Sequence, residues 1–217
     1  MKLYGANVCP FVHRARLTLA EKGVDYEYVA IDLRNKPAWY HEVLPSGKVP
    51  LLEDGSNRVW ESAIVCEYLE ERFPEPALLP TDPGPRARAR IWIDWVSNTL
   101  VAAYYKLLKA QSEEEQAEHR KSLREALAKL EKEGFQESSW LHGTELSLVD
   151  LLTYPWFERW RVLEHYRNFP VPNEFSKLQA WIATIEERES VKAIAEPPSF
   201  YIDQYAHYAR PAEAVTG

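Results

Sequence analysis

A proline-rich segment divides this chain into two parts with different residue patterning. Residues 73–85 read FPEPALLPTDPGP and contain five prolines. Proline fixes φ and lacks an amide N–H, so we expect no helix to cross this stretch. We interpret residues 75–85 as a linker between a first domain, residues 1–74, and a second domain, residues 86–217.

The first domain alternates between strand and helix patterns. Short runs predict strands at residues 2–6, 26–31, 49–53 and 58–60, and the sequence DGSN supplies turn residues between the last two. Helices are predicted at residues 10–22, 36–44 and 61–72, the first of them framed by Pro10 and Gly23. The predicted order is βαβαββα, which describes an α/β domain.

Only helix patterns follow the proline-rich segment. They predict helices at residues 86–110, 113–133, 148–166, 173–187 and 191–195. Residues 197–217 are rich in tyrosine, and we expect them to end in a loose tail. The predicted fold class is therefore an α/β domain followed by an all-helical domain.

Composition excludes several classes of protein. The 26 basic and 33 acidic residues give a net charge of −7, which argues against binding to nucleic acid or to an anionic membrane surface. No run approaches 18 apolar residues, and the first residues do not resemble a signal peptide. Two cysteines are too few for a fold of 217 residues to depend on disulfide bonds. We therefore expect a reducing compartment, the cytoplasm. We expect no metal site.

Cys9 is the residue with the most evident chemistry. It falls where the first predicted strand ends and the first helix begins, and Pro10 suits the first helical position. Cys9 would then cap the helix, with free N–H groups and the positive end of the helix dipole facing its sulfur. Such placement lowers a thiol pKa from about 8.5 to about 3.5–7.5 and makes the thiolate a nucleophile for disulfide exchange.

Two other features bear on the chemistry of Cys9. Position 12 is Val, so the chain lacks the second cysteine of a C-x-x-C pair and needs a thiol from another molecule, for which glutathione is the obvious source. His13 and Arg14 lie in the first helical turn, where they either stabilise the thiolate or form a solvated helix face. The alternative for Cys9 is a buried structural cysteine, and Cys66 is expected to be one.

Several motifs together resemble the glutathione transferase family. They are the strand–Cys9-Pro10-Phe11–helix junction, Val49-Pro50 before a hairpin, and Glu61-Ser62 at a helix start. A cysteine in place of a tyrosine or serine is similar to the omega and lambda classes, and residues 33–40 and 147–159 resemble omega-type segments. The resemblance implies a thioredoxin-like domain joined to a helical domain, with Cys9 as the catalytic residue.

The resemblance also implies a glutathione site in the first domain. It assigns Val49 and a cis Pro50 to the cysteinyl backbone of glutathione, although an X-Pro bond is usually trans. Lys36 matches a family lysine near the glycyl carboxylate, and by itself it is one surface lysine among many. Phe11 matches a residue that lines the site, and it would otherwise pack the helix.

Glu61 and Ser62 are expected to bind the γ-glutamyl end of glutathione. A helix N-terminus and a serine hydroxyl suit the α-carboxylate, and the Glu61 carboxylate suits the ammonium group. Without the resemblance, the pair is simply a helix cap. Ser147 and Asp150 form a similar capping-box pattern, which we interpret as structural.

The acceptor pocket is expected between the two domains. Its candidates are aromatic residues at helical spacing, which are more often part of a core. We select Tyr104, Tyr154 and Trp160 from the following set: Trp95, Tyr104, Tyr154, Trp156, Trp160, Tyr201 and Tyr205.

The resemblance implies a homodimeric, glutathione-dependent thiol transferase that reduces dehydroascorbate or removes glutathione from adducts by mixed-disulfide chemistry at Cys9. Two alternatives stay open: a non-catalytic ligand-binding or scaffold protein of the same fold, and a glutathionyl-hydroquinone reductase. The latter family is usually longer and has Trp where Phe11 stands here.

Overall fold

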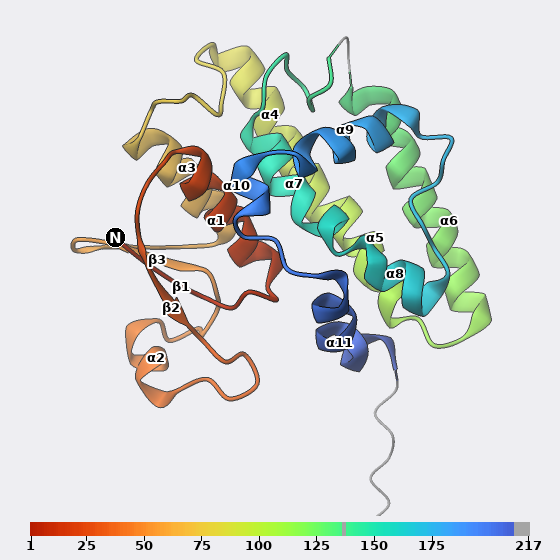
Figure 1. Cartoon of the computed structure of the whole chain (residues 1–217), viewed down its shortest axis with the longest axis horizontal. Helices are drawn as coiled ribbons and strands as arrows, with labels where there is room; N and C mark the ends of the chain where they lie inside the picture. Colours follow the sequence, from red (N-terminus) through yellow and green to blue (C-terminus); the bar gives the residue numbers. More distant parts are fainter. Residues whose placement is uncertain (136–137, 211–217) are drawn as a thin grey trace, which may run out of the picture.

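The computed structural model describes residues 1–135 and 138–210 and shows an α/β domain beside a helical domain (Figure 1). The first domain contains the strands β1 (Lys2–Gly5), β2 (Glu27–Ala30), β3 (Leu51–Asp54) and β4 (Asn57–Trp60) and the helices α1 (Pro10–Glu21), α2 (Ala38–Val43) and α3 (Ser62–Arg72). The sheet order is β2-β1-β3-β4; β1 pairs parallel with β2, and β3 pairs antiparallel with β1 and β4. The predicted order βαβαββα and the fold class are confirmed.

The helix α1 packs closely against the sheet. Leu3 and Leu52 of the sheet share a buried core with Val12 of α1 and Val65 of α3. Gly5 permits this close approach, because a Cβ there would lie 2.4 Å from Cγ1 of Val12. The end of β1 and the beginning of α1 therefore have a fixed relation, and the turn between them carries Cys9.

The second domain consists of helices. They are α4 (Pro83–Trp95), α5 (Val101–Lys109), α6 (Glu113–Lys129), α7 (Leu148–Glu158), α8 (Trp160–Arg167), α9 (Ser176–Glu186), α10 (Glu189–Lys192) and α11 (Pro198–Ala209). The π-helical turn η1 (Val96–Leu100) joins α4 to α5, and η2 (Leu130–Gly134) extends α6. No helix among residues 1–135 and 138–210 is long and apolar enough to span a membrane.

Several helix bounds differ from the expectation; α10, for example, spans Glu189–Lys192 instead of residues 191–195. The second domain's first helix begins at Pro83 instead of residue 86, because proline is tolerated in a first turn and Asp82 caps it by accepting a 2.8 Å hydrogen bond from Gly84 N–H. The expected helix 148–166 is two helices that meet at Arg159. The tyrosine-rich segment forms α11, and residues 211–217, the expected loose tail, lie outside the described part of the chain.

The linker is tied to the first domain by a buried carboxylate. Glu70 of α3 accepts hydrogen bonds from the backbone N–H groups of Leu78 and Leu79 at 3.0 Å each, and from the ammonium group of Lys22. All three partners are buried. The segment between the domains is thus a packed part of the structure.

The helix α7 lies at the centre of the second domain and packs against α1. Its N-terminus carries the predicted capping box: Ser147 N–H donates to Asp150 Oδ2 at 2.8 Å, and the Ser147 hydroxyl accepts from Val149 N–H at 3.2 Å. Asp150 is fully buried and also accepts from Nε1 of Trp181. The motif is structural, as expected.

Candidate active site

Cys9 lies at the N-terminus of α1, as predicted. It is the N-cap residue, its N–H donates to Ala6 carbonyl at 2.9 Å, and its carbonyl accepts from His13 N–H at 3.0 Å. The side chain is half-buried and free of any disulfide. It lines a cavity of about 880 Å³ that extends to the helical domain.

The thiol of Cys9 is subject to opposing effects. Burial raises its pKa, whereas the N–H groups of Val12 and Phe11 and the charges of Arg159 and Arg14 lower it. The net direction is upward, so the expectation of a lowered pKa is wrong for the free protein. The backbone N–H groups at the start of α1 lie where the sequence predicts them. Side chains of the helical domain, which is distant in the sequence, help to bury the sulfur.

A second cavity of about 590 Å³ brings together most of the residues predicted for glutathione. Phe11, Val49, Glu61 and Ser62 line it, and the Val49-Pro50 peptide bond is cis. Pro50 itself is buried beneath this surface.

Glu61 and its neighbour Lys48 give this cavity one charged rim. Glu61 has a φ of 64°, a left-handed conformation that non-glycine residues adopt rarely, and backbone strain of this kind clusters at functional sites. Its carboxylate lies 2.8 Å from Nζ of Lys48, and both side chains are exposed. Lys36 lines neither cavity and is half-buried on the approach to α2.

Arg14 is a cavity residue whose environment the sequence analysis left open. It is 1% exposed and donates to Leu152 carbonyl at 2.7 Å, to Ser62 Oγ at 3.2 Å and to Ser97 Oγ at 3.1 Å. Among the described residues no carboxylate forms an ion pair with it. Burial lowers its pKa to about 10. Of the two alternatives, the solvated helix face is therefore wrong for Arg14, because α1 is covered by the sheet on one side and by α7 on the other.

His13 is also buried rather than solvated. Its Nδ1 lies 2.8 Å from Oε2 of Glu158 and 3.0 Å from Nη1 of Arg159. Burial lowers the pKa of His13, which favours the neutral ring. The residue belongs to the contact between the domains.

The three residues selected for the acceptor pocket lie in the core of the helical domain instead. Tyr104, Tyr154 and Trp160 are almost fully buried and line neither cavity, which corrects that prediction. The Tyr104 hydroxyl donates to Arg159 carbonyl, and Nε1 of Trp160 donates to Phe169 carbonyl. Periodicity identifies aromatic helices, but it does not say which face turns to a core and which to a cavity.

The wall opposite Cys9 is nevertheless aromatic. Its side chains come from β2, α5 and α11, and they are Tyr28, Tyr105, Phe200, Tyr205 and Tyr208. Of the seven aromatic candidates, only Tyr205 is among the residues that line this cavity. Tyr105 is the next residue after Tyr104 in α5. The sequence therefore predicted the correct helix but the wrong face of it. Phe11 lines both cavities and joins them beside Cys9.

Cysteine and metal chemistry elsewhere is limited. Cys66 is completely buried, and burial raises its pKa to about 12, in keeping with the expected packing role. Within residues 1–135 and 138–210, no group of three or more His, Cys, Asp or Glu side chains is arranged to hold a metal ion.

Comparisons with known proteins agree with this arrangement. The family model of the glutathione S-transferase N-terminal domain matches residues 3–77, and that of the C-terminal domain matches residues 113–184. Glutathione S-transferase omega-1 from Mus musculus is 35% identical over 86% of this chain and 77% of its own length. Glutathione S-transferase omega-2 from Homo sapiens is 32% identical over 93% and 82%.

Solved structures show the same likeness in three dimensions. Glutathione transferase Omega 3C from Trametes versicolor is 34% identical with a TM-score of 0.87, covering 95% of this chain and 89% of that one. Rice GST1, solved in complex with glutathione, is 29% identical with a TM-score of 0.86 and 94% coverage of both chains. The domain order, the cavity beside Cys9 and these relatives lead to one conclusion: the chain belongs to the glutathione S-transferase family and is homologous to its omega-class members.

Proposed function

We propose that this protein is a glutathione-dependent thiol transferase that works through Cys9. The observation that supports this proposal most is the position of Cys9 at the N-terminus of α1, where it lines the larger cavity. Beside it, Phe11 lines both cavities and so connects the larger cavity to the smaller one. A glutathione molecule in the smaller cavity would have its sulfur near Cys9, and an acceptor would occupy the larger cavity.

The proposed reaction is an exchange between sulfur atoms. The Cys9 thiolate attacks the glutathione sulfur of a mixed disulfide, the S–S bond breaks, and the acceptor leaves as a thiolate that takes up a proton. Cys9 is then disulfide-bonded to glutathione. The thiolate of a second glutathione attacks that disulfide, which releases oxidised glutathione and restores Cys9.

The smaller cavity offers groups for each part of glutathione. The Val49 backbone, beside cis Pro50, would pair with the cysteinyl unit as an added strand. The N-terminus of α3 with Ser62 would take the α-carboxylate of the γ-glutamyl unit, and Glu61 would face its ammonium group. The buried charge of Arg14 supports a carboxylate here, because its guanidinium already contacts Ser62.

Two assignments rest on the family alone. We propose Lys36 for the glycyl carboxylate. As acceptors we propose glutathione adducts of small molecules or dehydroascorbate, which would take up two electrons and two protons as two glutathione molecules become oxidised glutathione. We also propose that the protein acts in the cytoplasm as a homodimer. Large apolar side chains that lie exposed on β4, α3 and α4 support an interface there: Trp60, Ile64 and Ile91. Conjugation to aryl halides should be weak, because a cysteine bonds to the glutathione sulfur instead of activating it.

Intact-protein mass spectrometry after treatment with oxidised glutathione tests the mechanism. We expect one glutathione adduct on Cys9 that reduced glutathione removes, no adduct on Cys9→Ala, and an unchanged adduct on Cys66→Ser, the matched control. Cys9→Ala should still bind glutathione in a calorimetric titration. Full thiol-transfer turnover in Cys9→Ala would refute the mechanism.

One observation favours a second candidate, a non-catalytic ligand-binding protein of this fold. Burial raises the pKa of Cys9, which disfavours the nucleophilic thiolate in the free protein. A pH titration of Cys9 alkylation with and without S-methylglutathione separates the two. A profile unaffected by this ligand, together with no thiol transfer, would support the non-catalytic function.

A further inference from the structure

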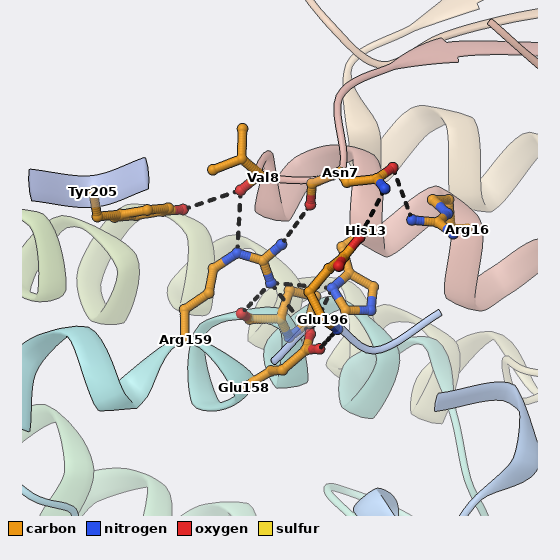
Figure 2. A network of polar contacts seen from close by, with 9 residues as sticks. Asn7, Val8, His13, Arg16, Glu158, Arg159, Glu196 and Tyr205 are labelled. Atoms are coloured by element: carbon orange, nitrogen blue, oxygen red, sulfur yellow. Dashed lines mark hydrogen bonds and ion pairs between the residues drawn. The ribbon is translucent and has the colours of Figure 1, made fainter. Parts of the chain in front are cut away.

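The turn before Cys9 is bonded to the helical domain through its backbone. The carbonyl oxygens of Asn7 and Val8 accept hydrogen bonds from Nη2 and Nε of Arg159, at 3.2 and 3.3 Å. The Tyr205 hydroxyl of α11 donates to the same Val8 carbonyl at 3.4 Å. Figure 2 shows the guanidinium of Arg159 pointing at this turn from below, with the Tyr205 hydroxyl reaching the Val8 carbonyl from the left.

Arg159 is itself fixed on every side. It is 0% exposed, its Nη1 donates to Pro155 carbonyl at 2.8 Å, and its guanidinium lies 4.2 Å from the ring centre of Tyr201. Glu158, whose side chain is 8% exposed, lies 3.4 Å from Nη1 and supplies the negative charge that a buried cation needs. These contacts hold the side chain in the conformation that the structure shows.

The backbone at Arg159 explains how the side chain reaches the first domain. The helices α7 and α8 meet at this residue, with φ and ψ of −89° and 6°. Its carbonyl accepts a hydrogen bond from the Tyr104 hydroxyl of α5 at 2.9 Å, which fixes the junction against a third helix. The interruption of the helix is thus a rigid feature that aims a guanidinium out of the helical domain.

We infer that Arg159 is a positioning residue, which holds the Asn7–Val8 turn and thereby sets the position of the Cys9 sulfur on the larger cavity. The inference rests on the proposed chemistry of Cys9. The planar guanidinium binds two successive carbonyl groups at once, which fixes both the distance and the orientation of the turn. Arg159 lines neither cavity, so it acts through the turn and not on the substrate.

The charge of Arg159 adds an electrostatic effect. It lowers the pKa of Cys9, as does Arg14 from within α1, against the larger opposing effect of burial. The other titratable groups that line the cavity of Cys9 are the neutral phenols of Tyr28, Tyr105 and Tyr205, together with Asp32, Arg34, His207 and Tyr208. The neutral His13 and the ionised Glu158 lie on the far side of the guanidinium.

Arg167 provides a matched control. It is likewise buried, and its guanidinium donates to the carbonyls of Leu107, Leu108 and Ala209 at 3.0, 2.6 and 2.6 Å. All of these groups belong to the helical domain. Loss of Arg167 should therefore lower stability as loss of Arg159 does, without disturbing Cys9.

The experiment measures the rate of Cys9 alkylation by iodoacetamide against pH, the kcat and KM for thiol transfer, and the melting temperature. In Arg159→Met we expect an alkylation profile displaced to higher pH and a kcat lowered by about tenfold or more, with the KM for glutathione within about twofold of the wild type. Arg159→Lys keeps the charge but not the planar fork, so its pH profile should return toward the wild type while kcat stays low. Arg167→Met should lower the melting temperature only.

The outcomes separate this inference from the proposed function. Wild-type pH profile and kcat in Arg159→Met, or effects equal to those of Arg167→Met at equal loss of stability, would overturn the positioning role. If Arg159→Met fails to fold, Arg159→Lys decides: a wild-type kcat there overturns the inference. Absence of thiol transfer in the wild type would refute the proposed function, whereas a displaced alkylation profile in Arg159→Met would still support the positioning of Cys9.

Discussion

Replacement of Arg14 by Met tests whether a buried cation recognises the γ-glutamyl carboxylate. Burial lowers the pKa of Arg14 from 12.5 to about 10, and no carboxylate of the described residues pairs with it. Such a fall corresponds to about 3 kcal/mol of unfavourable burial of the charge. A carboxylate bound beside Ser62 would recover part of that energy, so we expect glutathione to bind Arg14→Met about 10- to 100-fold more weakly.

The Arg14→Met substitution also changes the stability of the fold. Loss of the guanidinium leaves the Leu152 carbonyl and the hydroxyls of Ser62 and Ser97 without their donor, at a cost of about 1–3 kcal/mol. Removal of a desolvated charge offsets some of this cost. The melting temperature of the variant must therefore be measured together with its affinity.

A double-mutant cycle isolates the contact with the carboxylate. Wild type and Arg14→Met are each titrated calorimetrically with glutathione and with an analogue that lacks the α-carboxylate of the γ-glutamyl unit. We expect the substitution to matter for glutathione and hardly at all for the analogue, with a coupling energy of about 1.5 kcal/mol or more. Equal losses for both ligands would refute the reasoning, because Arg14 would then support the cavity without contacting the carboxylate.

Three further substitutions have distinct expected outcomes. Burial raises the pKa of Asp150 to about 6, so the folded state binds this proton more tightly than the unfolded chain does. The free energy of unfolding should therefore fall by about 3 kcal/mol as the pH rises from about 4 to about 6. In urea unfolding experiments, Asp150→Asn should lack this pH dependence. Glu70→Ala leaves Lys22 buried without its counter-charge, so its melting temperature should fall by about 10 °C. Phe200→Ala should raise the acceptor KM several-fold in steady-state kinetics, and Tyr154→Phe, in the core, should leave it unchanged.

Residues that start or end helices and form turns were sufficient to predict the helices and strands of the first domain. Pro10 and Gly23 mark the ends of α1 within one or two residues, and the turn sequence DGSN gives the β3–β4 hairpin. Alternation of strand and helix patterns then predicts the element order βαβαββα, whereas the strand order β2-β1-β3-β4 comes from the structure. These features depend on neighbouring residues, which a sequence displays directly.

The contacts between the domains could not be predicted in the same way. Arg14 and His13 follow Cys9 in a position that is normally solvated, and they are buried only because α7, more than 130 residues later, packs on α1. The break at Arg159 lies within a continuous apolar pattern, so periodicity extended one helix through it. The assignment of Tyr104 in place of Tyr105 has a similar cause, since the facing surface is set by tertiary packing.

The anchored linker has a consequence for how the chain denatures. Glu70 secures the segment between the domains, Arg14 and Arg159 each cross the boundary, and Arg188 forms a bidentate pair with Glu21 on the same boundary. A separated N-terminal fragment would expose buried charges whose partners lie on the missing half. We therefore expect the two domains, although distinct in architecture, to unfold together as a single cooperative unit.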